Sequence, residues 1–573
     1  MHLQYIYRLL CLCLVLSVLP HPLQAQEDAS VDIDDDINIR LASMTLEERV
    51  GQMFMVTLWG PTLSTSSRRF IATYAPGGVV LFGSNAGQPW SVAALTNDIQ
   101  QSAAASGAGI PMFIAIDQEG GITARLVPDD GYTGFPVSQV ITATGTPATA
   151  YAIGQALAEE LRAVGVNMNL APVADLETNR DNPVIARRAF GSDPEQVAAM
   201  IAAFVAGTQD AGVIATAKHF PGHGDTTQDS HTTLPVVTHP LERLRDVELV
   251  PFAAAIDADV GAVMVAHIWF PELEPIERRP ASLSSSIVTG LLREGMGYTG
   301  LIVTDAIGMD AIDRNYGYGE ASILAIQAGV DLIAFGTVGM KAQQATIEAV
   351  VEAVRAGDIS EARIDASTRR ILEAKARFGL FDRAPIDPDV AAETLNVEAH
   401  RRLVNDMFLH AVTLVKDAYA LLPLTAEKTN LLVFFDVYGD VAYDCKRRLP
   451  GLRSMSIPFR PGAEVRARIL DAVQWVDTVV VFTDNAIDTP EQAALVNALP
   501  PDKTVVVALR SPYDLLAFPD VGAYLVIYTP LPAARAVICD LLMGDVTPSG
   551  VLPVTLEGLY AAGDGLQGFT PRP

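Results

Sequence analysis

Positive charge is scarce in this chain. Its 573 residues include 67 Asp and Glu but 40 Lys and Arg, which gives a formal net charge of −27 at pH 7. Nucleic-acid binding requires a basic surface that neutralises phosphates, so this charge argues against a nucleic-acid partner. It also disfavours attraction to anionic membranes. An acidic surface of this kind most often serves solubility.

Cysteine is scarce too. The chain has four cysteines, which excludes a disulfide-rich scaffold. Two of them lie in the first 13 residues, and the other two are Cys445 and Cys539. The later pair either forms one bridge or remains as two buried thiols, because sequence alone gives no distance between them.

Long apolar runs are missing as well, so we expect no stable membrane insertion. The run Leu9–Leu19 is too short to cross a bilayer. It follows the basic residue Arg8 and precedes the small residue Ala25, the pattern of a secretory signal. We therefore predict a signal peptide over residues 1–25 and a secreted or extracytoplasmic protein, in the periplasm or at the cell surface.

The remaining chain divides into an acidic disordered spacer (26–40), a large domain (41–384), a linker (385–396) and a smaller domain (397–573). The spacer is predicted from its run of acidic residues. Ordered structure is expected to begin at Thr45-Leu-Glu-Glu48, a capping-box pattern at the start of a helix. The linker is predicted from the prolines at 385 and 388.

Eight short β-type runs alternate with helical stretches in the large domain. This number predicts a (β/α)8 barrel of the TIM type, with an open doubly wound sheet as the alternative. The expected strands are Met53–Leu58, Gly78–Phe82, Met112–Asp117, Val166–Pro172, Val213–His219, Ala262–His267, Leu301–Asp305 and Asp331–Phe335.

The α/β pattern restarts after the linker and predicts a smaller three-layer α/β sandwich. A helix is expected over His400–Val415, and no glycine-rich phosphate-binding fingerprint follows, so a nucleotide site is not expected. The expected strands are Leu431–Phe435, Thr478–Phe482, Val505–Leu509 and Tyr524–Tyr528.

The most informative segment for function is residues 218–231. It reads Lys-His-Phe-Pro-Gly-His-Gly-Asp-Thr-Thr-Gln-Asp-Ser-His and follows an apolar strand. A barrel enzyme carries its active site at the carboxyl ends of its strands, where this segment begins. His231 can exchange a proton near neutral pH, and the nearby Asp229 can orient its ring and stabilise its charged form.

These histidines and aspartates could also suggest a metal site. However, Pro221, Gly222 and Gly224 break any helix that would bring His219 and His223 together, and no metal-binding spacing is present. We expect no metal and no cofactor.

A second candidate group is Asp305, which ends the expected strand Leu301–Asp305. A carboxylate in this place can act as a nucleophile or a general base. It can also simply cap the helix that follows.

Taken together, these motifs resemble glycoside hydrolase family 3, in its β-N-acetylhexosaminidase branch. The resemblance covers roughly residues 41–380 and continues into the second domain through Pro548-Ser-Gly-Val-Leu-Pro-Val554. Its motifs are Asp117-Gln-Glu-Gly-Gly121, Asn182-Pro-Val-Ile185, Arg188-Ala-Phe-Gly191, the 218–231 segment, Ala266-His267 and Thr304-Asp305. The chain departs from the family pattern at Ile122 and Ala189.

The resemblance implies a retaining, two-step hydrolysis of terminal β-linked N-acetylglucosamine from peptidoglycan fragments or chitin oligosaccharides. Asp305 would be the nucleophile, and His231 with Asp229 the acid/base pair. The residues that match the family's sugar-binding positions are Asp117, Arg125, Arg188, Lys218 and His219.

Three alternatives stay open: another sugar specificity, transfer of the glycosyl group to phosphate, and a catalytically silent carbohydrate-binding protein on the same fold. The oligomeric state is not predicted.

Overall fold

A computed structural model describes residues 25–230 and 232–570, with side chains from residue 34 onward. The predicted signal peptide therefore lies outside the described residues apart from position 25, and His231 lies outside them as well. None of the helices that the described residues form has the length and apolarity of a membrane-spanning segment.

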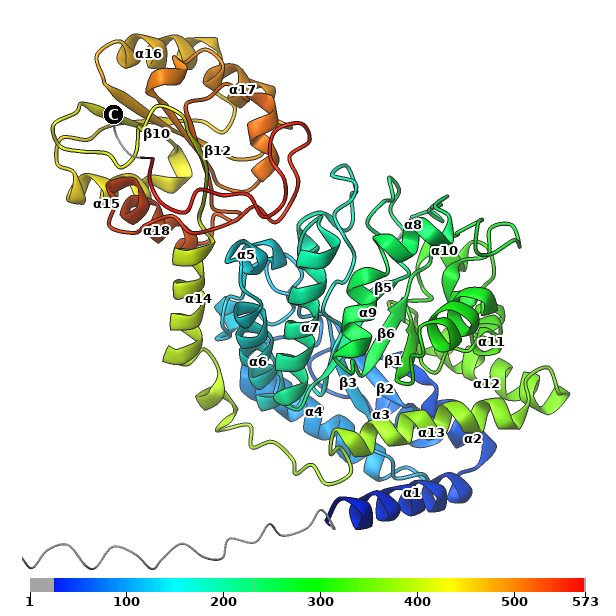
Figure 1. Cartoon of the computed structure of the whole chain (residues 1–573). Coiled ribbons are helices and arrows are strands. Elements are labelled where there is room, and N and C mark those ends of the chain that lie inside the picture. The colour runs from blue at the N-terminus through cyan, green and yellow to red at the C-terminus, as the bar shows by residue number, and fades with distance from the viewer. Residues whose placement is uncertain (1–24, 231, 571–573) are drawn as a thin grey trace, which may run out of the picture.

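The large domain is a closed barrel of parallel strands (Figure 1). Its sheet order is β7-β6-β5-β4-β3-β2-β1-β8, and a bridge between Val303 and Leu332 joins β7 to β8. Closure confirms the predicted barrel and excludes the open sheet. The strands are β1 (Phe54–Thr57), β2 (Gly78–Leu81), β3 (Phe113–Ile116), β4 (Met168–Asn169), β5 (Ile214–Phe220), β6 (Ala262–Val265), β7 (Leu301–Thr304) and β8 (Ile333–Ala334).

Helices surround these strands because the strands are apolar on both faces and must be covered (Figure 1). The predicted capping box is present at Thr45 and Glu48, ahead of α2 (Leu46–Gln52). The other long barrel helices are α3 (Thr65–Tyr74), α4 (Pro89–Ala104), α6 (Pro147–Ala163), α7 (Pro194–Asp210), α9 (Val250–Asp257), α11 (Tyr318–Ala328), α12 (Met340–Ala356) and α13 (Glu361–Arg377).

The predicted disordered spacer is wrong over residues 26–40, which lie in helix α1 (Ala25–Ser43). Ile37 is buried with Leu372 of α13 and with Met44, and Leu41 packs against the same cluster. Ile37 and Leu41 sit four apart on one face of α1 and anchor it on the barrel, despite its acidic composition.

The second domain contains a six-stranded sheet in the order β11-β10-β12-β13-β14-β9. Helix α14 (Glu398–Ala411) lies beside the barrel and leads into this domain (Figure 1). The strands are β9 (Thr413–Asp417), β10 (Asn430–Phe435), β11 (Arg453–Ile457), β12 (Thr478–Thr483), β13 (Thr504–Ala508) and β14 (Ala523–Val526), and the main helices are α15 (Gly439–Arg448), α16 (Ala463–Val473), α17 (Pro490–Val496) and α18 (Pro532–Met543). All four predicted strands are present, and β9 and β11 are additional.

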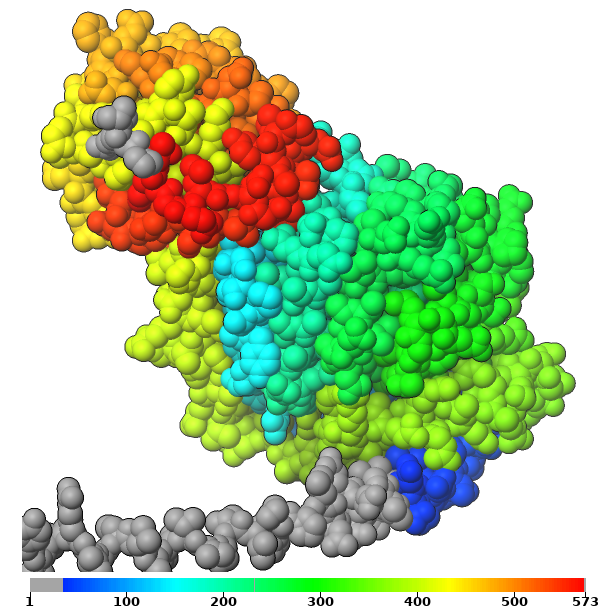
Figure 2. Space-filling view, viewed as in Figure 1, coloured from blue at the N-terminus to red at the C-terminus, as the bar shows by residue number. Residues whose placement is uncertain are grey.

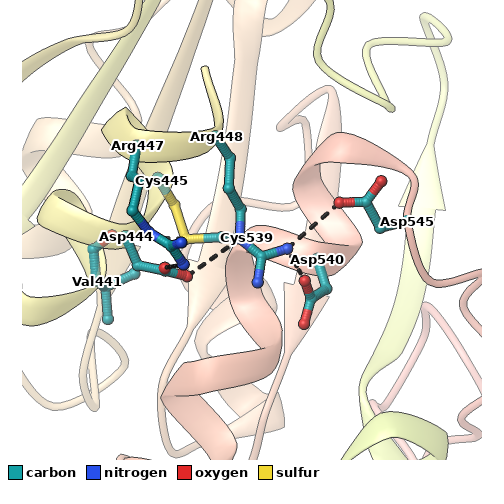
Figure 3. The surroundings of a disulfide bond; sticks show 8 residues. All are labelled: Val441, Asp444, Cys445, Arg447, Arg448, Cys539, Asp540 and Asp545. Carbon is teal, nitrogen blue, oxygen red and sulfur yellow. Dashed lines mark hydrogen bonds and ion pairs between the residues drawn. A yellow bond between two sulfur atoms is a disulfide. The ribbon is translucent and has the colours of Figure 1, made fainter. Parts of the chain in front are cut away.

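A disulfide bond joins Cys445 of α15 to Cys539 of α18 (Figure 3). It decides between the two alternatives that the sequence left open. Beside it, Arg448 forms ion pairs with Asp540 and with Asp545 (Figure 3). The two helices are thus linked covalently and electrostatically.

The second domain contacts the barrel through the segment 548–554. Figure 2 shows the red C-terminal part of the chain, to which this segment belongs, in the second domain above the barrel. The backbone N–H of Val551 donates to the carbonyl of Ala143, and that of Ser192 donates to the carbonyl of Pro553. A Cβ on Gly191 would lie 2.2 Å from this Pro553 oxygen, so a glycine is needed for the close approach. The segment 548–554 therefore attaches the second domain to the barrel.

Candidate active site

The candidate residues meet at the carboxyl ends of the barrel strands. Asp117 follows β3, Asp305 follows β7, and Lys218 and His219 lie near the end of β5. The pairing of β5 with β6 shifts register between Lys218 and Phe220. Such an irregularity changes the direction of side chains along a strand, which helps β5 to present two consecutive polar residues at the mouth of the barrel.

Lys218 is the centre of a buried charged network. Its Nζ lies 2.9 Å from Oδ1 of Asp117 and 2.7 Å from Oε1 of Glu119. Arg188 binds Glu119 with both Nε and Nη2, at 2.8 and 2.7 Å. Arg125 is attached more loosely, with 3.7 Å between its Nη2 and Oδ2 of Asp117. The structure therefore brings together four of the five residues predicted to bind sugar.

Glu119 was quoted within the motif after β3 but was not predicted as a site residue. It is buried, and burial alone would raise its pKa, yet Lys218 and Arg188 outweigh burial and lower the pKa to about 2. Lys218 shows the matching effect: burial opposes its charge, but Asp117 and Glu119 raise its pKa above the usual value. Glu119 and Lys218 are thus both ionised at neutral pH.

His219, the fifth predicted residue, is held by Asp175. Its Nδ1 lies 2.7 Å from Oδ2 of Asp175, and its backbone N–H donates to the same carboxylate. Asp175 is fully buried, which would raise its pKa, but the contacts with His219 lower it. Asp175 orients the ring of His219 so that Nε2 is left for another contact. Asp175 was missed, although it lies in the segment that follows β4 (Met168–Asn169).

Asp305 is half-buried, and its Oδ1 accepts a hydrogen bond from the N–H of Ala306 at 2.7 Å. His267 supports the same turn, because its Nε2 donates to the carbonyl of Ala306 at 3.1 Å while its Nδ1 accepts from the hydroxyl of Ser282. Burial lowers the pKa of His267, so this imidazole is neutral. The turn after β7 is therefore held in place by His267.

The loop after β5 carries Asp229, which is half-buried and whose carbonyl accepts hydrogen bonds from the N–H groups of Thr232 and Thr233. Because residue 231 lies outside the described part, the pairing of His231 with Asp229 stays a prediction. Within residues 25–230 and 232–570, no group of three or more His, Cys, Asp or Glu side chains is arranged to hold a metal ion.

Comparison with known proteins places this geometry in a family. The family described as "Glycosyl hydrolase family 3 N terminal domain" matches residues 45–374. "Beta-hexosaminidase A" of Pseudoalteromonas piscicida is 35% identical over 374 residues, which cover 62% of this chain and 62% of that protein. The chain thus matches less than two thirds of that relative's length.

Solved structures that are similar to this chain cover both of its domains. A glycoside hydrolase family 3 β-N-acetylglucosaminidase from Paenibacillus sp. strain FPU-7 superimposes with a TM-score of 0.78 at 37% identity, over 90% of this chain and 99% of that one. A β-glucoside phosphorylase superimposes with a TM-score of 0.77 at 25% identity, over 92% of this chain and 97% of that one.

Proposed function

The chain belongs to glycosyl hydrolase family 3, and on that premise we propose that it is a retaining exo-β-N-acetylglucosaminidase. Its substrates would be peptidoglycan fragments or chitin oligosaccharides, from which it removes terminal β-linked N-acetylglucosamine. The names of the β-hexosaminidase and β-N-acetylglucosaminidase relatives support the choice of this sugar.

One arrangement carries the proposal. A half-buried carboxylate, Asp305, shares the mouth of the barrel with a network of ionised groups built on Lys218. Asp117, whose side chain is 20% exposed, can accept hydrogen bonds from sugar hydroxyls while Lys218 and Arg125 hold it in place. Such fixed directions orient the terminal sugar with its anomeric carbon toward the nucleophile.

In the first step, an oxygen of Asp305 forms a bond to the anomeric carbon as the bond to the leaving oxygen breaks. His231, in its charged form, gives a proton to the leaving oxygen, and the released sugar or oligosaccharide is neutral. Asp229 stabilises the charged imidazole before the transfer.

In the second step, His231 is a neutral base. It takes a proton from water as the water oxygen attacks the anomeric carbon, and the bond to Asp305 breaks to restore its carboxylate. Two displacements at the same carbon retain the β configuration. Glu119 and Lys218 do not exchange protons in either step, because both stay ionised.

Transfer to phosphate instead of water is the second candidate reaction. The similarity to a β-glucoside phosphorylase favours keeping it. A neutral imidazole would repel an attacking phosphate less than a carboxylate base would. A rate that rises with phosphate would identify this reaction.

We also propose that the protein works outside the cytoplasm. The disulfide between Cys445 and Cys539 supports this location, because such bonds form and persist in oxidising compartments.

The test is hydrolysis of 4-nitrophenyl β-N-acetylglucosaminide beside the matching glucoside, with and without phosphate. Fast release from the N-acetyl sugar, independent of phosphate, is expected, and the first sugar product should have the β configuration. Asp305→Ala should lower turnover at least about 10⁴-fold, whereas Asp257→Ala, an exposed aspartate on α9, should match the wild type. Substantial turnover by the Asp305 variant would exclude it as the nucleophile, and silence with every substrate would favour a carbohydrate-binding protein.

A further inference from the structure

A buried histidine that the proposed reaction does not use connects the two ends of the loop after β5. His223 is 1% exposed. Its Nε2 lies 2.9 Å from the hydroxyl of Ser230, and its Nδ1 lies 3.1 Å from the hydroxyl of Thr226. Both hydroxyl residues are also 1% exposed. The ring therefore links the start of the loop to the residue directly after Asp229.

The base of this link is held rigidly. The side-chain amide of Asn182 donates to the carbonyls of His223 and Gly224, each at 2.9 Å, and to the hydroxyl of Thr226 at 3.2 Å. The N–H of His223 donates to the buried carboxylate of Asp175 at 2.7 Å. His223 is thus hydrogen-bonded to the same aspartate that orients His219. Both the backbone and the ring of His223 are fixed by hydrogen bonds.

The ring is also in the right state for a permanent structural link. Burial, together with the nearby charge of His219, lowers the pKa of His223 to about 4. A neutral imidazole donates through one nitrogen and accepts through the other, which suits two hydroxyl partners. The contact does not switch over the pH range in which the enzyme would work.

We propose that His223 and Ser230 are positioning residues for proton transfer: their hydrogen bond fixes the loop end that carries Asp229 at the mouth of the barrel. This inference rests on the proposed function, because it assigns a purpose to the loop only if that loop delivers the acid/base pair.

Without the link, Asp229 would lose the buried neighbour that fixes this end of the loop. A displacement of about 1 Å can lower a rate about 100-fold when a proton must pass between fixed atoms. Binding of the terminal sugar would change little, because the network of Lys218, Glu119 and Arg188 does not include Ser230.

The experiment uses the full-length protein and a series of aryl and alkyl β-N-acetylglucosaminides whose leaving groups differ in pKa. kcat/KM reports the step in which the leaving oxygen departs, and acid catalysis matters most for poor leaving groups. For Ser230→Ala, we expect kcat/KM to fall at least about 10-fold for poor leaving groups and to change less than about twofold for 4-nitrophenyl. The dependence of kcat/KM on leaving-group pKa therefore becomes steeper.

Thr227→Ala is the matched control, since Thr227 is an exposed hydroxyl residue of the same loop. It should keep the wild-type dependence. A uniform loss for all leaving groups in Ser230→Ala, or an unchanged dependence, would overturn the positioning role.

A second pair of variants keeps the proposal testable if removal of the Ser230 hydroxyl prevents folding. The amide of an asparagine takes the place of Nδ1 of a histidine, and that of a glutamine takes the place of Nε2. His223→Gln can keep the contact with Ser230, and His223→Asn the contact with Thr226. We expect kcat/KM for poor leaving groups to be about 5- to 10-fold higher in His223→Gln than in His223→Asn. Equal rates for the two variants would contradict the proposal.

Asp229→Asn in the same series separates the inference from the proposed function. If it keeps the wild-type dependence on leaving group, the acid/base assignment fails, and the positioning role fails with it. If Asp229→Asn steepens the dependence while Ser230→Ala does not, the acid/base assignment stands and the positioning role alone is refuted.

Discussion

At the scale of single residues, Glu119 is the group on which the charged network depends. Because its folded pKa of about 2 lies below the unfolded value of about 4.3, its stabilising contribution is complete above pH 4.3 and is lost as the pH falls through 2. Glu119→Gln leaves Lys218 and Arg188 buried with one carboxylate fewer. We expect the free energy of unfolding to drop by about 3–5 kcal/mol at pH 7.

Urea unfolding at pH 7 measures this change. Glu277→Gln removes a charge from an exposed position after β6 and serves as the control, with little change expected. If both variants unfold at the same urea concentration as the wild type, Glu119 does not stabilise the buried charges of Lys218 and Arg188.

Lys375 presents the opposite case, a buried lysine to which the described side chains supply no carboxylate partner. Its Nζ lies 2.6 Å from Oε1 of Gln52 and 4.9 Å from the centre of the Phe113 ring. Burial lowers its pKa well below the usual value. The folded state therefore carries a cost that is complete below the folded pKa and disappears as the pH rises through the unfolded value of about 10.4.

Lys375→Met removes this cost, and we expect it to raise Tm at pH 6 by about 2–4 °C. The gain should shrink as the pH approaches 10, which thermal unfolding across this range would show. A gain that is the same at every pH would mean that packing, and not charge, is responsible.

The sequence indicated the candidate site residues more readily than the residues that contact them. Asp117, Lys218 and His219 could be found because each lies where an apolar strand ends. Glu119 and Asp175 were missed because a carboxylate in a turn has many ordinary uses, and its pairing depends on distances across the barrel. His223 was noted as one of a cluster, but its bond to Ser230 depends on how the loop folds back.

At the scale of elements, the bond between α15 and α18 is expected to stabilise the second domain. It closes a loop with a sequence separation of 94 residues. A constraint of this length removes unfolded-state entropy worth about 5 kcal/mol. Replacing both cysteines by serine should therefore lower the unfolding temperature of this domain, as calorimetry would measure.

A reductant provides the control for this prediction. It should lower the Tm of the wild type toward that of the double variant and leave the variant itself unchanged. A wild-type Tm that a reductant does not change would mean that the bond is not formed in solution.

The elements that were predicted well are strands with continuous apolar sequences. Those that were missed lack a clear apolar pattern or lie directly beside another element. All eight barrel strands were found, because central strands are continuous apolar runs. β9 was missed because a single residue, Val412, separates it from α14, so its residues Thr413–Val415 extended the expected helix. β11 was missed because it is a partly exposed edge strand with the sequence Arg-Ser-Met-Ser-Ile. α1 was missed because its few apolar contacts are hidden in an acidic run.

At the scale of the whole molecule, one buried carboxyl group links the barrel to the second domain. Glu177 of the barrel is hydrogen-bonded to Gln139 and to the hydroxyl of Tyr513 in the second domain. It lines a cavity of about 130 Å³ between the domains, together with Tyr513 and Arg187. Burial raises its pKa to about 7, although Tyr513, Gln139 and Arg187 act in the opposite direction.

This raised pKa predicts how the contact between the domains responds to pH. The folded protein keeps Glu177 protonated up to about pH 7, whereas the unfolded chain loses the proton near pH 4.3. Stability from this group is therefore complete below pH 4.3 and falls as the pH rises to 7, by an amount on the order of 3 kcal/mol.

Glu177→Gln keeps an uncharged amide in place of the carboxyl group, so it should remove this part of the pH dependence. Calorimetry between pH 4.5 and pH 8 should show a Tm that falls less steeply for the variant than for the wild type. Glu195→Gln, at an exposed position of α7, should follow the wild type. If Glu177→Gln follows it as well, the carboxyl group is ionised in the folded protein. The contact between Glu177 and Tyr513 would then make no contribution to stability that depends on pH in this range.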